Sequence, residues 1–333
     1  FIMYTAMVIV SYSGARLIIG SGGSTMGVGD LSSLFTYGMQ ILSSLMMLSM
    51  IFVMITISNA SMQRIYEVLS EESTIKNPEN PITAVPDGSI DFNNVSFKYH
   101  KGAEKNALTG IDLHIKSGET IGIIGGTGSS KSSLIQLISR LYDATEGQVL
   151  VGGNDVKSYD IETLRNAVSV VLQKNVLFSG TIKENLRWGD MDATDEELVS
   201  ACKLAQADEF INTLPDGYDT HIEQGGTNVS GGQKQRLCIA RALLKKPKII
   251  VFDDSTSAVD TKTDALIRNA MANEIPDTTK IIIAQRISSV QEADRIVVME
   301  DGRINAVGTH EELLASNEIY KEVYYSQNKA GEE

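Results

Sequence analysis

The sequence has few of the residues that mark several common classes of protein. Its 333 residues include two cysteines, Cys202 and Cys238, which match no metal-binding spacing, so we expect buried thiols in a reducing compartment. A basic excess is also missing, because 29 Lys and Arg stand against 42 Asp and Glu, a net charge of -13. Nucleic-acid-binding surfaces are basic, so this composition argues against a nucleic-acid partner.

Charge is almost absent from residues 1–58, which contain only Arg16 and Asp30. Residues 31–58 form an uncharged run that would extend about 42 Å as a helix, against roughly 30 Å of bilayer hydrocarbon. We predict transmembrane helices at about 1–19 and 31–70, within a membrane region spanning residues 1–72.

The two predicted helices are separated by a glycine-rich turn, residues 20–30, in which we expect Asp30 to cap the second helix. No basic segment precedes the first apolar run, so a cleaved signal peptide is not expected. The chain begins inside an apolar segment without an initiator Met, and we interpret it as part of a longer membrane protein.

Basic residues predict the orientation of these helices. The turn has no Lys or Arg, whereas Arg64 and Lys76 follow the second run, which places that end in the cytoplasm of a multi-pass plasma-membrane protein. Three prolines, Pro78, Pro81 and Pro86, mark a linker over residues 73–89. A cytoplasmic nucleotide-binding domain is predicted over residues 90–328.

The segment IGIIGGTGSSKSSLIQL, Ile121 to Leu137, has an apolar strand, a glycine-rich turn, a lysine with hydroxyls, and an apolar helix. Such a turn directs backbone N–H groups at a phosphate near a helix N-terminus. Lys131 is expected to reach the outer phosphates and Ser132 to ligate Mg²⁺. Ser130 stands where the pattern has a second glycine, which costs roughly 1–2 kcal/mol if the backbone there is left-handed. A glycine-rich turn without a ligand remains open at this stage.

Residue patterns on both sides of this segment predict an α/β fold. Alternating apolar residues from Ile90 to Ile115 predict a small antiparallel sheet, and residues 181–245 are mostly helical in pattern. Apolar strands at 168–172, 249–252 and 281–284 predict a mostly parallel sheet with its site at the carboxyl ends of the strands.

Two further motifs bear on phosphate chemistry. The strand KIIVFDD delivers Asp253 and Asp254 to its carboxyl end, where Asp253 suits the coordination of Mg²⁺. The motif NVSGGQKQR, Asn228 to Arg236, places a serine and two glycines at a helix start. Alone, the first motif also suits an ordinary strand end and the second an ordinary helix cap. Their order along the chain, with NVSGGQKQR between the phosphate loop and the acidic strand, is much more specific.

At these residues the chain resembles the ATP-binding cassette (ABC) proteins, and with the membrane hairpin it resembles exporter half-transporters of the multidrug or lipid type. The resemblance implies an α/β nucleotide-binding domain, with a P-loop parallel sheet, an antiparallel β subdomain and a helical subdomain, preceded by all-α transmembrane helices. It implies ATP and Mg²⁺ as cofactors, with the metal held by Ser132, Gln173 and Asp253. It assigns nucleotide contacts to Tyr99, Gly125, Gly126, Thr127, Gly128, Ser129, Ser130, Lys131, Ser132, Ser133, Ser230, Gly231, Gly232, Gln233 and Asp260.

The same resemblance implies that two cassettes dock head to tail, with each ATP between the phosphate loop of one chain and the signature of the other, here Val229 to Gln233. The Q-loop residue is Gln173, and the D-loop spans Ser257 to Asp260. The sequence Glu223 to Gly226, EQGG, resembles the transmission loop of heterodimeric exporters.

Two catalytic positions depart from the family pattern. The usual catalytic Glu is Asp254, shorter by one methylene, and the usual switch His is Gln285, which can donate a hydrogen bond but cannot relay a proton. Together with Gln173, these are the candidate catalytic residues. The pattern predicts a degenerate, slowly hydrolysing site on this chain and an intact signature that completes the hydrolytic site of a partner half-transporter.

The sequence therefore predicts one subunit of a heterodimeric, ATP-driven exporter that moves hydrophobic or amphipathic substrates out of the cytoplasm across the lipid bilayer. A homodimeric exporter with two slow sites is an alternative. A non-transporting regulator, or a soluble repair or translation ATPase, is another, although the uncharged run of residues 31–58 disfavours it.

Overall fold

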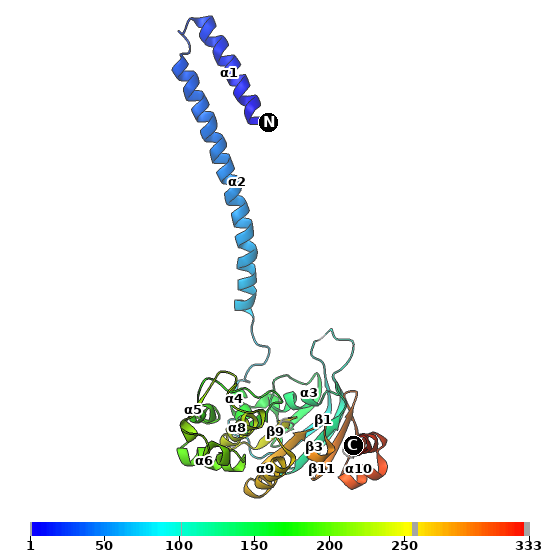
Figure 1. The fold of residues 1–333 in the computed structure, drawn as a ribbon. Helices are drawn as coiled ribbons and strands as arrows, with labels where there is room; N and C mark the ends of the chain where they lie inside the picture. Colours follow the sequence, from blue (N-terminus) through cyan, green and yellow to red (C-terminus); the bar gives the residue numbers. More distant parts are fainter. Residues whose placement is uncertain (1, 101, 255–258, 330–333) are drawn as a thin grey trace. The chain divides into compact units, whose positions relative to one another are not determined.

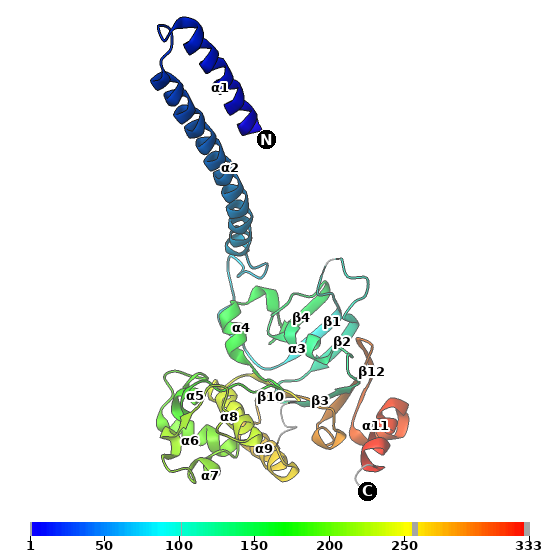
Figure 2. The ribbon, with the colours of Figure 1, turned by 45° about the horizontal axis from the view of Figure 1, so that its top comes forward.

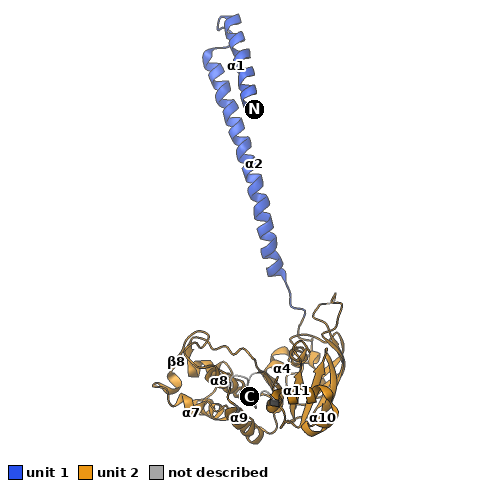
Figure 3. Ribbon diagram, turned by 45° about the vertical axis from the view of Figure 1, so that its right-hand side comes forward, with its two compact units in different colours: residues 1–74 blue, residues 75–333 orange. Residues whose placement is uncertain are grey.

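The computed structural model describes residues 2–100, 102–254 and 259–329. The chain forms two compact units, residues 1–74 and residues 75–333, which are coloured separately in Figure 3. The second unit begins at Ile75, inside the range predicted as a linker. Within the predicted linker, Ile82 is bonded to the segment around Ser158. Its N–H donates to the Ser158 carbonyl and its carbonyl accepts from the Asp160 N–H, both at 2.9 Å.

The first unit is a helical hairpin of α1 (Ile2–Ser21) and α2 (Val28–Ser70), shown in blue in Figure 1. In the described part of this unit, both helices are long and apolar enough to cross a membrane. The turn is shorter than the predicted range 20–30. Asp30 lies inside the first turn of α2, where its carboxylate accepts from the Gly27 N–H at 2.9 Å.

A close approach of the two helices explains one glycine of the hairpin. Gly14 of α1 is buried against α2. A Cβ atom at this position would lie 2.4 Å from Cδ1 of Leu31, so a larger residue would push that side chain aside. Beyond Leu42, α2 exposes its apolar side chains, as expected of a helix that meets lipid or other helices.

The second unit contains the antiparallel sheet expected from the alternating pattern. The described strands pair in the order β2-β1-β4-β5, with all neighbours antiparallel. Their bounds are β1 (Ile90–Phe97), β2 (Leu108–Ile115), β4 (Glu146–Val151) and β5 (Asn154–Asp155). Figure 2 shows β1, β2 and β4 together, with α3 (Lys131–Ile138) beside them.

A second, mostly parallel sheet carries the phosphate loop. Its described strands pair in the order β12-β11-β3-β10-β9-β6, and β12 runs antiparallel to β11. Their bounds are β3 (Thr120–Gly125), β6 (Val168–Val171), β9 (Ile249–Asp253), β10 (Thr279–Ile283), β11 (Arg295–Glu300) and β12 (Arg303–Gly308). The strand before the phosphate loop, β3, and the acidic strand, β9, flank β10, so the ends of all three strands meet at one edge.

Helices cover this sheet and form a separate lobe. The remaining described helices are α4 (Ile161–Ala167), α5 (Ile182–Arg187), α6 (Asp195–Leu204), α7 (Asp208–Ile211), α8 (Gly231–Leu244), α9 (Thr261–Glu274), α10 (His310–Ser316) and α11 (Glu318–Lys329). Short 3₁₀ turns span Val156–Ser158, Gly217–Asp219 and Ile287–Ser289, and β7 (Gly180–Thr181) pairs with β8 (His221–Ile222). In Figure 2, α5, α6, α7 and α8 lie together as the predicted helical subdomain.

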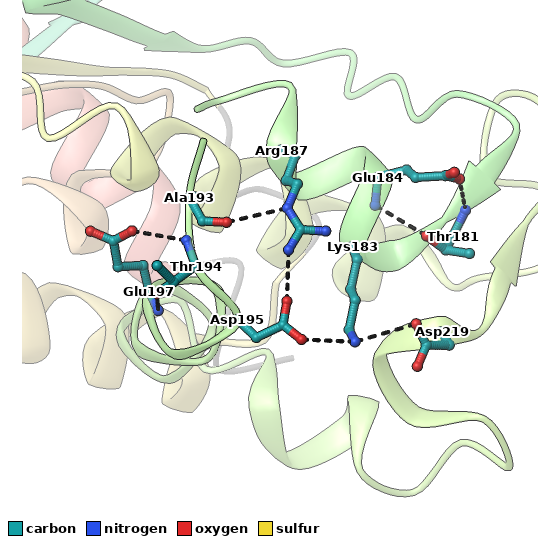
Figure 4. Close-up of polar contacts among 9 residues, drawn as sticks. All are labelled: Thr181, Lys183, Glu184, Arg187, Ala193, Thr194, Asp195, Glu197 and Asp219. Carbon is teal, nitrogen blue, oxygen red and sulfur yellow. Dashed lines mark hydrogen bonds and ion pairs between the residues drawn. The ribbon is translucent and has the colours of Figure 1, made fainter. Parts of the chain in front are cut away.

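Polar contacts fix the ends of two helices in this lobe (Figure 4). Thr181 and Glu184 form a capping box at the start of α5, and Thr194 and Glu197 form another at the start of α6. Asp195 joins the two helices, because it accepts from Lys183 at 3.0 Å and from Arg187 at 2.6 Å. This ion-pair network is solvent-exposed, so the caps and the buried core contribute more to stability than the charges do.

Two apolar cores support these layers. One lies between the antiparallel sheet, α3 and one face of the parallel sheet, with Phe92 and Ile123 among its buried residues. The other joins the opposite face of the parallel sheet to the helical lobe and to the C-terminal helices, and it includes the fully buried Tyr320. Because the parallel strands are buried on both faces, the strand ends at the phosphate loop are rigidly placed.

Candidate functional site

The phosphate loop runs from the end of β3 into α3. Gly125 has a φ of 159°, and a Cβ atom there would lie 2.3 Å from the carbonyl oxygen of Met299, so only glycine fits beside β11. Ser130 has a φ of 67° and is therefore left-handed, which meets the condition stated for a strain cost at this position. Its side chain makes no capping hydrogen bond to α3, so the strain at Ser130 is not offset there.

Lys131 lies over this loop. Its Nζ donates to the carbonyl oxygens of Gly125 and Gly126, at 2.7 and 3.0 Å, and to Oγ of Ser129 at 3.1 Å. Burial lowers the pKa of Lys131, while the nearby charges of Asp253 and Asp254 oppose that shift. A cation held by neutral carbonyls in a partly buried loop is suited to binding an incoming phosphate group.

Ser132 and Asp253 face each other from α3 and β9. The Ser132 hydroxyl donates to Oδ2 of Asp253 at 3.2 Å. A hydroxyl and a carboxylate are hard oxygen donors, and Mg²⁺ in such sites usually takes few protein ligands beside phosphates and water. Among the described residues, no group of three or more His, Cys, Asp and Glu could hold a metal by itself. This donor set therefore fits Mg²⁺ shared with phosphates, and Ser132 and Asp253 would hold it.

Asp254 accepts hydrogen bonds from two glutamine side chains. Nε2 of Gln173 lies 2.8 Å and Nε2 of Gln285 lies 2.9 Å from the same carboxylate oxygen, Oδ2. Burial, followed by the charge of Asp253, raises the pKa of Asp254 above its ordinary value. The backbone of Asp254 is also left-handed, with a φ of 47°, and its N–H donates to Ile283 at the end of β10.

These groups line one hollow of about 370 Å³ at the carboxyl edge of the sheet. The predicted site residues that line it are Gly125, Gly126, Thr127, Gly128, Lys131, Ser132, Gln173, Asp253, Asp254 and Gln285. Ile319 and Val323 of α11 also line it, and the sequence analysis did not identify them. Their i, i+4 spacing was a usable signal that they share a helix face, but nothing in the sequence placed that face against the phosphate loop.

Tyr99 does not line this hollow but is tied to α3, the helix that follows the phosphate loop. Its hydroxyl is 2.8 Å from Oγ of Ser133 and donates to Oε1 of Gln136 at 3.1 Å. Its ring meets Phe97 and Tyr142 edge to face, with centroids 4.8 and 5.2 Å apart. Tyr99 remains 44% exposed, so its ring is oriented by neighbours yet accessible for stacking.

The signature lies at the start of α8 in the helical lobe. The Ser230 hydroxyl accepts from the Gln233 N–H at 3.2 Å, and Oε1 of Gln233 accepts from the Ser230 N–H at 2.9 Å. Gly231 and Gly232 supply two N–H groups in the first turn of α8. Ser230, Gly231, Gly232 and Gln233 all lie in the described part of the chain, and none of them lines the hollow at the phosphate loop.

The D-loop is described only in part. Its residues Ser257 and Ala258 lie outside the described residues, whereas Asp260 caps α9 by accepting from the Thr263 N–H at 2.9 Å. This hydrogen bond lowers the pKa of Asp260. Like the signature, Asp260 does not line the hollow.

A parallel sheet that ends in a glycine-rich loop, a lysine and an acidic strand defines a P-loop nucleotide-binding domain. The family described as ABC transporter matches residues 108–257. The chain is 41% identical over 98% of its length to an uncharacterised ABC transporter ATP-binding protein, YfiB, of Bacillus subtilis. It is 42% identical over 82% of its length to a putative multidrug export ATP-binding/permease protein, YgaD, of the same organism.

A solved structure, a bacterial Atm1-family ABC exporter with ATP bound, superposes on 96% of the chain with a TM-score of 0.77 and 33% identity. Residues 108–257 thus form an ATPase domain of the ABC transporter family, which binds ATP. The predicted fold class is confirmed. The chain spans 56% of the length of YfiB, 47% of YgaD and 56% of the solved exporter chain.

Proposed function

We propose that this chain is one subunit of an ATP-driven exporter, multi-pass in the plasma membrane, that moves hydrophobic or amphipathic compounds out of the cytoplasm. Its similarity to a putative multidrug export protein and to an Atm1-family exporter supports the class of transporter. The two apolar helices of residues 1–74 support a membrane location. A soluble repair or translation ATPase has no use for such helices.

We further propose that this subunit holds ATP and Mg²⁺ at a slow site. The observation that carries this proposal is the pair of amide hydrogen bonds that Gln173 and Gln285 donate to Oδ2 of Asp254. An attacking water needs a carboxylate oxygen within hydrogen-bond reach. Here that oxygen already accepts two hydrogen bonds, and the shorter Asp side chain ends about one methylene further from the phosphate.

The pKa of Asp254 does not by itself explain slow chemistry. A raised pKa makes a carboxylate the stronger base, so basicity favours rather than limits hydrolysis. The reach of the side chain opposes it, because a displacement of about 1 Å costs on the order of 10²-fold in rate. Gln285 adds a second deficit, since a glutamine amide cannot become cationic beside the terminal phosphate. The shorter reach of Asp254 and the missing positive charge at Gln285 therefore outweigh the raised pKa of Asp254 in their effect on the rate of hydrolysis.

The signature is proposed to act in trans. Its residues do not line the hollow formed by its own phosphate loop, which supports a site closed by donors from a second chain. We propose a heterodimer in which Ser230 to Gln233 complete the partner's faster site. A homodimer with two slow sites uses the same contacts, and a lone chain that is fully active as a dimer would favour it.

The test compares ATP turnover by the chain with that of the variant Asp254→Glu/Gln285→His. The signature is unchanged in this variant, so two copies can close each other's sites. We expect the double variant to hydrolyse ATP on the order of 10²-fold faster than the unmodified chain, with little change in ATP affinity. Fast turnover by the unmodified chain, at a rate the double variant does not exceed, would contradict the slow site.

A further inference from the structure

One side chain of α11 connects the C-terminal helix to the loop that carries Gln285. Nε2 of Gln327 donates to the Gln285 carbonyl at 2.7 Å, and Oε1 of Gln327 accepts from the Ile287 N–H at 2.9 Å. The two contacts engage backbone groups on both sides of Arg286. Gln285 in turn donates to Asp254, so a continuous series of hydrogen bonds runs from α11 to the acidic end of β9.

The helix that carries Gln327 is firmly attached to the rest of the unit. Tyr320 is fully buried, and its hydroxyl is 2.7 Å from Nδ1 of His310 at the start of α10. The Tyr320 N–H donates to Oδ1 of Asn317 at 2.9 Å, which fixes the first turn of α11. One face of α11 presents Ile319 and Val323 to the nucleotide hollow. Gln327 thus projects from a fixed helix and not from a free end.

We propose that Gln327 is a positioning residue that holds the peptide of Gln285 so that its side-chain amide faces the terminal phosphate. The backbone groups that it engages are the Gln285 carbonyl, after β10, and the N–H of Ile287, the first residue of the 3₁₀ turn Ile287–Ser289, where the chain leaves the sheet. Without Gln327 these groups must find other partners, and the loop gains freedom. The proposal rests on the slow site argued above, because it assigns to Gln285 a contact with bound ATP.

Two readouts test the role of Gln327 in the full chain. Hydrogen exchange of the peptide covering residues 284–290, without nucleotide, reports on the loop, and the dissociation rate of a fluorescent ATP analogue with Mg²⁺ reports on the site. We expect Gln327→Ala to raise both rates roughly three- to tenfold, the effect of losing one or two neutral hydrogen bonds.

Two further variants separate positioning from stability. In Gln327→Glu, Oε1 can still accept from the Ile287 N–H, but the donor to the Gln285 carbonyl is lost. In this variant, hydrogen exchange of residues 284–290 should stay as slow as in the unmodified chain, while the ATP analogue should dissociate faster. A general weakening of α11 would raise both rates. Ser326→Ala is the matched control, because the Ser326 hydroxyl bonds only to Val323 within the same helix in the described contacts, and it should change neither rate.

The proposal is overturned if Gln327→Ala leaves either rate unchanged. It is also overturned if exchange in β3, residues 120–125, rises as much as in the loop, because the effect would then be loss of folding. Fast hydrolysis by the unmodified chain would contradict the slow site and leave the exchange result for Gln327 intact. The two failures are therefore distinguishable.

Discussion

Nε2 of Gln285 lies 2.9 Å from Oδ2 of Asp254, so the residue proposed to replace the family's switch histidine binds the residue proposed to replace its catalytic glutamate. The two substitutions are thus in direct contact. Gln173 donates to the same oxygen at 2.8 Å. The three side chains form a hydrogen-bonded cluster that lines the same hollow as Lys131, Ser132 and Asp253, the residues suited to hold phosphate and Mg²⁺.

The charge of Asp254 should make the protein less stable as pH rises. The folded-state pKa of Asp254 is raised above the ordinary 3.8 by burial and by Asp253, so the folded state binds the proton more tightly than the unfolded state. Stability falls as pH rises from about 3.8 through the raised pKa. Asp254→Asn should therefore raise the melting temperature at neutral pH and give no gain below that window.

Thermal unfolding without nucleotide, measured at several pH values, checks this expectation. Asp301→Asn, on an exposed turn, serves as the comparison for removing one negative charge. A melting temperature of Asp254→Asn that tracks Asp301→Asn at every pH would show that the environment of Asp254 has no such effect.

Ser130→Gly should stabilise the protein. The left-handed backbone at Ser130 costs a residue with a Cβ about 1–2 kcal/mol, and glycine removes this cost. About half of the benefit is lost again, because glycine has the larger conformational entropy in the unfolded chain. No capping bond is lost, so we expect a net gain of about 0.5–1 kcal/mol, or about 1–4 °C in melting temperature. Ser133→Gly, inside α3, should instead lower it, and a fall for both variants would contradict this reasoning.

Tyr99→Ala should weaken ATP binding by about 1–3 kcal/mol, the usual effect of losing an aromatic surface on which a base can stack. Tyr99→Phe keeps the ring and removes only the hydroxyl contacts with Ser133 and Gln136. It should therefore bind ATP nearly as well as the unmodified chain. Titration calorimetry with ATP distinguishes the two, and equal losses in both variants would show that the hydroxyl, and not stacking, matters.

A mixing experiment should show that Ser230 acts on the other chain. The triple variant Asp254→Glu/Gln285→His/Ser230→Ala has a restored catalytic site but no working signature. The unmodified chain has an intact signature but a slow catalytic site. Each alone should hydrolyse ATP slowly, whereas the mixture should be at least roughly tenfold faster than either. A mixture that equals the mean of its components would contradict the exchange of signatures between chains.

Much of the fold was predictable because local patterns and global structure agree in this chain. Period-two apolar residues predicted β1 and β2, and the short apolar strands β6, β9 and β10 stand where their runs predicted them. The sequence pattern raised a left-handed backbone at Ser130 only as a condition, and the structure shows that the condition holds.

Contacts between distant segments were not predictable in the same way. No local pattern indicates that Gln327 meets the loop at Gln285, because that contact depends on how α11 packs against the sheet. The pairing of Ile82 with the loop at Ser158 is of the same kind, since it joins residues of low regularity. The shared use of Oδ2 of Asp254 by two glutamines likewise depends on rotamers that sequence does not reveal.

The identity of the nucleotide held by the unmodified chain tests the central claim most directly. The chain is incubated with Mg²⁺ and radiolabelled ATP, freed of unbound nucleotide, and its bound label is separated into ATP and ADP over time. We predict that ATP remains the main bound species while Asp254→Glu/Gln285→His, treated identically, holds mainly ADP. Rapid conversion to ADP on the unmodified chain would contradict the account.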